Sequence, residues 1–97
     1  MSTEIKIARV YLREGDASFK ELIHLLKEVE KVRGFTLFRG FDGMGASGQA
    51  GHLADLSLQM PTVVEFFDHP DRVDAIIEAC KGIVKANHVI SWFGEMS

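Results

Sequence analysis

The chain has 97 residues, of which 46% are hydrophobic and 26% are charged, and its formal net charge is −3. This length suits one domain with a small core, and the ordinary composition excludes a chain that is disordered throughout. The acidic balance disfavours nucleic acid as a partner, because proteins that bind phosphate backbones usually carry a basic patch.

The sequence contains one cysteine, Cys80, which cannot form an internal disulfide. The N-terminal residues lack the basic and apolar regions of a signal peptide. No apolar run approaches the roughly 20 residues that a membrane span needs. We therefore expect a cytoplasmic protein without membrane insertion.

Residues 5–12 alternate in polarity, which predicts the first strand. Both of its faces are partly apolar, since Ala8 and Val10 fall on one face and Ile7 and Tyr11 on the other.

Residues 19–32 carry apolar side chains at intervals of three and four, which predicts an amphipathic helix. Asp16 or Ser18 can cap this helix, and Glu21 follows Ser18 at the spacing of a capping box. Gly34 is expected to end the helix as its C-terminal glycine.

Residues 35–41 predict the second strand, and the glycine-rich segment 39–52 holds five of the nine glycines. So many glycines are incompatible with helix or strand throughout, because glycine loses the most backbone entropy on ordering. Long loops in compact domains are usually functional or mobile. We expect a long flexible loop at about 42–60, within which 52–58 fits a short strand, a helical turn or an extended arm.

The second half of the chain predicts a strand, a helix and a strand. The strand covers residues 62–68, and Asp68 and Pro70 suit the cap and first turn of the helix. An apolar stripe at helical spacing reaches residue 84. The last strand is predicted over 88–93, followed by a tail.

This order predicts an α+β, ferredoxin-like split βαβ domain spanning residues 1–97, with two helices on one face of a four-stranded antiparallel sheet. The other face would stay open although it carries Ile7 and Tyr11. A contiguous apolar face on a small domain usually marks an interface, so we expect a homo-oligomer, a dimer or a trimer, built on that face.

Three runs of sequence, residues 7–14, 35–48 and 58–68, resemble the PII-like family known as domain of unknown function 190. The middle run is the most specific, with Arg39-Gly40-Phe41 followed by a Gly-Met-Gly-Ala-Ser-Gly segment. The resemblance implies a trimeric signalling protein that binds adenine nucleotides between subunits. It also implies that the loop between the second and third strands, here about residues 42–57, contacts a target protein.

The chain departs from the PII pattern in two connections. The connection at 84–88 has no glycine and is too short for a nest of backbone amides, so we expect AMP or another adenine nucleotide as the ligand. Before the first helix, Asp16-Ala17-Ser18-Phe19 stands where the family usually has glycine-lysine-proline.

The candidate ligand-binding residues lie in or beside the glycine-rich segment and the 84–88 connection. Glycine amides, an arginine and a serine hydroxyl suit phosphate, and histidines border the predicted cleft. The set is Arg39, Gly40, Phe41, Gly43, Gly45, Ser47, His52 and His88. The segment is neither a Walker loop nor a Rossmann fingerprint, because it lacks the lysine of the first and the following helix of the second. We expect no catalytic residues and no metal site.

Several residues have more than one interpretation. Arg9, Arg39 and Glu65 fit an ion-pair network in the oligomer core or a phosphate or carboxylate site at a subunit boundary, since buried charges need partners. Trp92 fits packing or the stacking of an adenine, and Cys80 fits the core. The main function hypothesis is a PII-like regulator; the alternatives are a pure interaction module without a ligand and, less favoured, a small enzyme with an intersubunit site.

Overall fold

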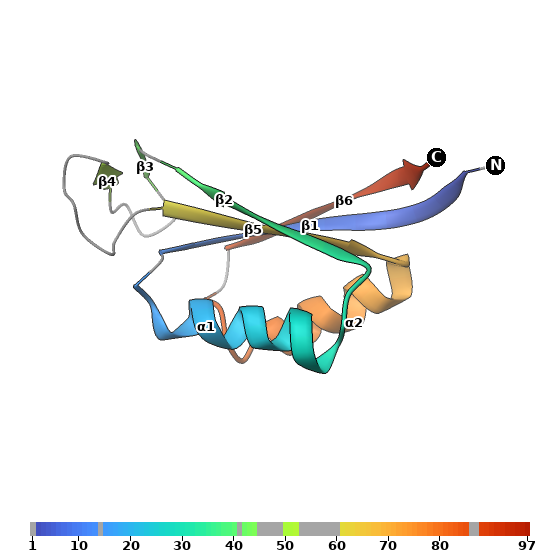
Figure 1. Cartoon of the computed structure of the whole chain (residues 1–97), viewed down its shortest axis with the longest axis horizontal. Helices are drawn as coiled ribbons and strands as arrows, with labels where there is room; N and C mark the ends of the chain where they lie inside the picture. The colour runs from blue at the N-terminus through green and yellow to red at the C-terminus, as the bar shows by residue number, and fades with distance from the viewer. Residues whose placement is uncertain (1, 14, 41, 45–49, 53–60, 86–87) are drawn as a thin grey trace.

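Four long strands form one antiparallel sheet in the order β2-β5-β1-β6 (Figure 1). They are β1 (Thr3–Arg13), β2 (Gly34–Arg39), β5 (Pro61–Asp68) and β6 (Val89–Met96). The computed structural model describes residues 2–13, 15–40, 42–44, 50–52, 61–85 and 88–97.

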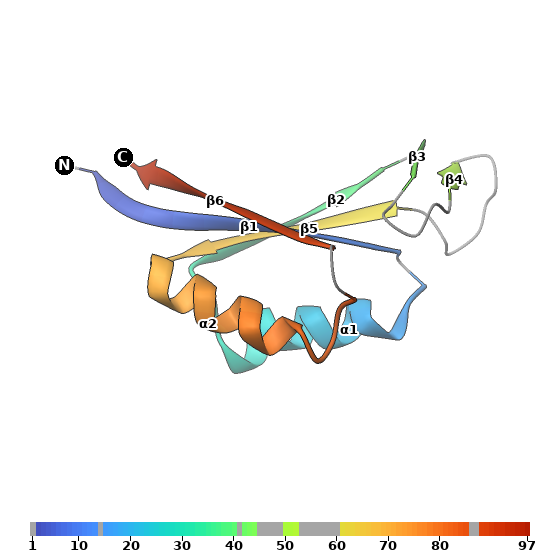
Figure 2. The ribbon, with the colours of Figure 1, turned by 180° about the vertical axis from the view of Figure 1, so that it is seen from behind.

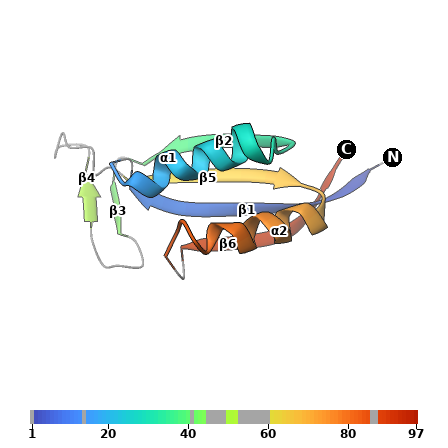
Figure 3. The same cartoon turned by 90° about the horizontal axis from the view of Figure 1, so that it is seen from below.

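Two helices cover one face of the sheet (Figures 1 and 2). Helix α1 (Ala17–His24) continues into the π-helical segment η1 (Leu25–Val29), and α2 (Pro70–Cys80) lies beside it on the same face (Figure 3). This is the ferredoxin-like split βαβ fold that the order of predicted elements indicated.

The core lies between this helical layer and the two central strands. It is built from side chains of one face of β1 and β5 and of the inner faces of the helices, with Val84 beyond α2: Ala8, Val10, Leu12, Leu22, Leu26, Val64, Phe66, Val73, Ile76, Cys80 and Val84. The period of two in the strands and the three-four spacing in the helices place these residues on the same side.

The end of the first helix differs from the prediction. The helical segment ends at Val29, and the chain reverses at Lys31, which has φ 49. Gly34 therefore does not end the helix; it is the first residue of β2. Glycine fits this position because a Cβ there would overlap the ring of Phe67 on the neighbouring strand.

The predicted helix caps are confirmed only in part. Asp16 holds the N-cap position of α1 but makes no side-chain cap hydrogen bond, and Ser18 lies inside the helix, so the predicted capping box does not form. The N-cap of α2 is His69, while Asp68 is the last residue of β5. Pro70 opens α2 as predicted.

Two segments predicted as loop or tail contain strand. Within the expected long loop, β3 (Asp42–Met44) pairs with β4 (Ala50–His52) in an antiparallel hairpin. At the C-terminus, β6 continues to Met96 because Met96 pairs with Thr3 of β1. Residues 45–49 and 53–60 lie outside the described residues, and the flexibility of the loop stays a prediction.

In the described part of the chain, the second face of the sheet has no covering helix (Figure 2). Large hydrophobic side chains are exposed there: Tyr11, Phe38, Ile90 and Trp92. The predicted open apolar face is therefore present. Among the described helices, none is long and apolar enough to cross a membrane.

Candidate functional site

The base of the glycine-rich segment lies where β2 leaves the sheet. The Gly40 amide donates a hydrogen bond to the Pro61 carbonyl oxygen at 2.8 Å. A Cβ on Gly40 would lie 3.2 Å from Pro61 Cγ, so glycine allows the two chain segments to stay this close. Arg39 pairs with Thr62 on β5 and has an exposed side chain.

The hairpin beyond this base places two other predicted site residues. Gly43 lies opposite Gly51, and His52 lies opposite Asp42. The remaining candidates in the segment, Phe41, Gly45 and Ser47, lie outside the described residues. Their roles stay predictions.

His88 lies at the other edge of the sheet, one residue before β6. Its carbonyl oxygen accepts a hydrogen bond from the Tyr11 amide at 2.8 Å, and the residue is half-buried. The strand order places β5 and β1 between β2 and β6. At normal strand spacing the two edges are roughly 14 Å apart.

Arg39 and His88 nevertheless share one end of the sheet. The Tyr11 amide binds the His88 carbonyl oxygen, and Tyr11 pairs with Val63 of β5. Arg39 pairs with Thr62, which is the residue directly before Val63. A single chain thus holds Arg39 and Gly40 on one edge and His88 on the opposite edge. It does not bring the two halves of the predicted set together.

The centre of the open face carries the Arg9–Glu65 part of the predicted ion-pair network. Arg9 Nε lies 2.7 Å from Glu65 Oε1. The Arg9 guanidinium is 5.4 Å from the Trp92 ring centroid and 5.9 Å from that of Phe38. The hydrogen bond to Glu65 raises the pKa of Arg9 above its usual value.

The two strand arginines therefore have separate environments. Arg9 faces the open side with Glu65, whereas Arg39 shares the helix-side face of the sheet with Thr62. Trp92 contacts the Arg9 guanidinium across neighbouring strands. This contact favours the packing interpretation of Trp92 within the subunit.

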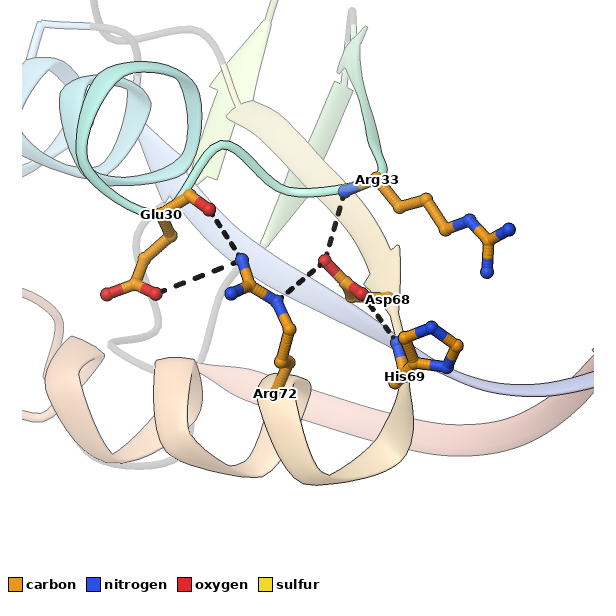
Figure 4. Close-up of polar contacts among 5 residues, drawn as sticks. All are labelled: Glu30, Arg33, Asp68, His69 and Arg72. Carbon is orange, nitrogen blue, oxygen red and sulfur yellow. Dashed lines mark hydrogen bonds and ion pairs between the residues drawn. The ribbon is translucent and has the colours of Figure 1, made fainter.

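A polar cluster that the sequence did not predict lies at the opposite end of the sheet (Figure 4). The Asp68 carboxylate accepts hydrogen bonds from the His69 amide at 2.7 Å, Arg72 Nε at 3.0 Å and the Arg33 amide at 3.1 Å. Arg72 also donates to the Glu30 carbonyl oxygen. The available sequence signal was the i, i+4 spacing of Asp68 and Arg72.

This Asp68 cluster has a structural role. It connects the α1–β2 connection to the start of α2, and the Asp68 side chain is 7% exposed. Burial alone would raise the pKa of the carboxyl, but the hydrogen bonds from His69, Arg72 and Arg33 outweigh it, and the pKa lies below its usual value.

The described residues contain no group of three His, Cys, Asp or Glu side chains that could hold a metal ion. Cys80 is buried in the core, and burial raises the pKa of its thiol to about 11. At neutral pH the thiol is protonated and is a poor nucleophile.

Comparison with known proteins identifies relatives of the whole domain. The family model DUF190, described as "Uncharacterized ACR", matches residues 5–95. A UPF0166 protein of Methanocaldococcus jannaschii is 30% identical over 90 residues, which cover 88% of this chain and 83% of the relative.

Solved structures share the fold. CPII, a nitrogen regulatory PII-like protein from Thiomonas intermedia bound to ADP, AMP and bicarbonate, has a TM-score of 0.64 and 14% identity, covering 99% of this chain and 96% of its own. The B. subtilis GlnK–ATP complex has a TM-score of 0.58 and 18% identity, covering 100% and 85%. At these identities the structures establish the fold alone. The family is shown by the model that matches residues 5–95. The chain therefore belongs to the DUF190 family, and its fold is PII-like.

Proposed function

We propose that this protein is a PII-like regulatory protein that forms a trimer and binds an adenine nucleotide between subunits. Two findings support this function. The chain belongs to the DUF190 family, and it shares its fold with CPII, which was solved with ADP and AMP, and with GlnK, which was solved with ATP.

The position of the candidate residues carries the proposal. Arg39 and Gly40 lie on the β2 edge of the sheet, and His88 lies on the β6 edge at the same end. In a ring of subunits in which the β2 edge of one copy approaches the β6 edge of the next, the two half-sites meet. One complete site then forms at each subunit boundary.

Assembly of this kind also covers the open face. Exposed Tyr11, Phe38, Ile90 and Trp92 would leave water, which is favourable at about 25 cal/mol per Å² of apolar surface. In a closed cyclic oligomer every copy buries the same surface. A trimer is the state that the family resemblance implies.

Three of the candidate residues, Arg39, Gly40 and His88, have defined roles in this proposal. The Arg39 guanidinium binds phosphate oxygens through paired N–H donors. Gly40 lets the ligand approach the backbone, and the His88 ring contacts the nucleotide from the neighbouring subunit. The short connection that ends at His88 favours AMP or ADP over a triphosphate. Nucleotide binding changes the 42–57 segment, which engages a partner protein.

Light scattering and titration calorimetry test assembly and binding separately. Wild-type protein should form a trimer and bind AMP or ADP. Arg39→Gln and His88→Gln should each weaken binding by about 10-fold or more, the effect of losing a hydrogen bond to a charged group. Arg33→Gln and His24→Gln are matched controls, because Arg33 lies at the opposite end of the sheet and His24 is exposed on α1.

Mixing the two binding variants tests whether the site spans two subunits. In mixed trimers, an Arg39→Gln subunit still supplies His88 and a His88→Gln subunit still supplies Arg39. Random mixing should restore about a quarter of the sites at wild-type affinity. If the mixture binds no better than either variant alone, the site does not span the boundary.

Hydrogen exchange tests the role of the 42–57 segment. Peptides from this segment should change their exchange on addition of AMP or ADP, while peptides from the core of β5 should not. If the trimer binds none of AMP, ADP, ATP or cyclic AMP and the segment never changes, the ligand-free interaction module becomes the better description.

A further inference from the structure

The open face of the sheet combines apolar side chains with a charged pair. Its exposed side chains are mainly aromatic and aliphatic, yet its centre holds the Arg9–Glu65 ion pair. The aromatic rings of Trp92 and Phe38 lie on either side of the Arg9 guanidinium, each from an edge strand. One charged pair is thus surrounded by the apolar side chains of all four strands.

The pair is only partly shielded in the single chain. The Arg9 side chain is 41% exposed and the Glu65 side chain is 25% exposed. The Nε–Oε1 bond and an interaction with the Tyr11 side chain use only part of the five N–H donors of the guanidinium, and a carboxylate can accept several hydrogen bonds. If the apolar surface around the pair is covered, the pair loses its water. The remaining donors and acceptors then need partners from the covering surface.

The charges on this face select a copy of the same chain as that surface. The centre presents one positive and one negative group side by side. A second copy, suitably rotated, can therefore place its carboxylate against the guanidinium and its guanidinium against the carboxylate. A uniformly acidic surface would leave Glu65 facing like charge, and a basic surface would do the same to Arg9. A purely apolar surface would leave both groups without replacement for their water.

We propose that Arg9 and Glu65 are the self-recognition element of the assembly: each Arg9 also binds the Glu65 carboxylate of a second copy and thereby fixes the relative rotation of the subunits. This inference rests on the proposed assembly through the open face. The apolar residues supply the driving force for association but tolerate many orientations. The buried charges permit only the orientations in which every guanidinium meets a carboxylate.

Charge reversal tests the proposal. Arg9→Glu places two acidic groups at the centre of each face, and Glu65→Arg places two basic groups there. Each variant should dissociate at least about 100-fold more readily than wild type in dilution experiments read by native mass spectrometry. Circular dichroism should show that the isolated subunits keep their secondary structure.

Two combinations separate recognition between copies from stabilisation within one copy. The double variant Arg9→Glu/Glu65→Arg restores one charge of each sign in every chain and should assemble again. Mixing the two single variants should produce hetero-oligomers that contain both, because each variant supplies the sign that the other lacks. If the pair acts only within one chain, the double variant assembles but the mixture does not, and the proposal is overturned.

A second ion pair serves as the matched control. Glu78 of α2 and Lys81, the residue that follows α2, form a pair whose side chains are both 69% exposed, away from the open face. Lys81→Glu and Glu78→Lys should leave assembly unchanged. Unchanged assembly of Arg9→Glu and Glu65→Arg would also refute the proposal. A wild-type protein that stays monomeric would instead refute the proposed assembly itself.

Discussion

Asp68 and Arg72 join the end of β5 to the first turn of α2 through an ion pair in which Arg72 Nε lies 3.0 Å from Asp68 Oδ2. The same carboxylate accepts the amide hydrogen of Arg33, which precedes β2. One buried side chain therefore links three segments at the end of the sheet opposite the hairpin (Figure 4).

Replacing this carboxylate should weaken the fold. In Asp68→Asn the amide nitrogen faces N–H donors, and the charge-assisted bond to Arg72 is lost. We expect the free energy of unfolding to fall by about 1 to 3 kcal/mol, measured by urea denaturation. Glu78→Gln, in the exposed pair with Lys81, should change it by less than about 0.5 kcal/mol. Equal effects of the two substitutions would contradict the structural role of Asp68.

The same carboxylate should make stability depend on acid pH. The pKa of Asp68 is below its usual value in the folded state, so its contribution is fully present above the unfolded pKa of about 3.9. That contribution is lost as the pH falls through the folded pKa. We expect the difference in the free energy of unfolding between wild type and Asp68→Asn, measured by urea denaturation between pH 2 and 7, to become smaller only below about pH 4. A gap that narrows between pH 5 and 7 would point to another group.

The Cys80 thiol should be unreactive in the folded protein. Burial raises its pKa to about 11, and the residue is 1% exposed, so both thiolate formation and reagent access are suppressed. At pH 8, alkylation by iodoacetamide should be more than about 100-fold slower than in urea-unfolded protein. Fast native alkylation that does not track unfolding would show that the thiol is accessible.

Two glycines should respond differently to alanine. At Gly34 a Cβ overlaps the Phe67 ring, which must move, so Gly34→Ala should lower the free energy of unfolding by about 1 kcal/mol or more. At Gly82 the nearest atom to an added Cβ is the Ala79 carbonyl oxygen at 3.9 Å. Gly82→Ala should therefore be neutral or stabilising, because alanine restricts the unfolded chain. Thermal denaturation of both variants provides the comparison, and a neutral Gly34→Ala would show that the Phe67 ring moves without cost.

The sheet and its helices could be predicted because their signals are local and repeated. Alternation over residues 5–12 and the three-four spacing after residue 19 correspond to β1 and to α1 with η1. The order of elements then limits the topology to few possibilities. The open apolar face followed from the same alternation, because Ile7 and Tyr11 occupy the side of β1 that the helices do not cover.

The errors occurred where a distant residue decides the local structure. Gly34 has the position of a helix-ending glycine, yet its neighbour Phe67 explains it, 33 residues away in the sequence. Residues 94–96 look like a tail but pair with the start of β1. Asp68 looks like a helix cap but accepts a hydrogen bond from Arg33 on another connection. None of these partners is visible in a local window.

The sequence by itself determined which segments form strands and helices, which faces are apolar, and that the glycine-rich segment follows the second strand. These properties depend on backbone periodicity and side-chain transfer from water, which act within a few residues. Only the tertiary structure decided that Arg39 and His88 lie on opposite edges of one sheet end, and that Arg9 meets Glu65 between two aromatic rings. Strand order and register set these distances, and both arise from long-range pairing.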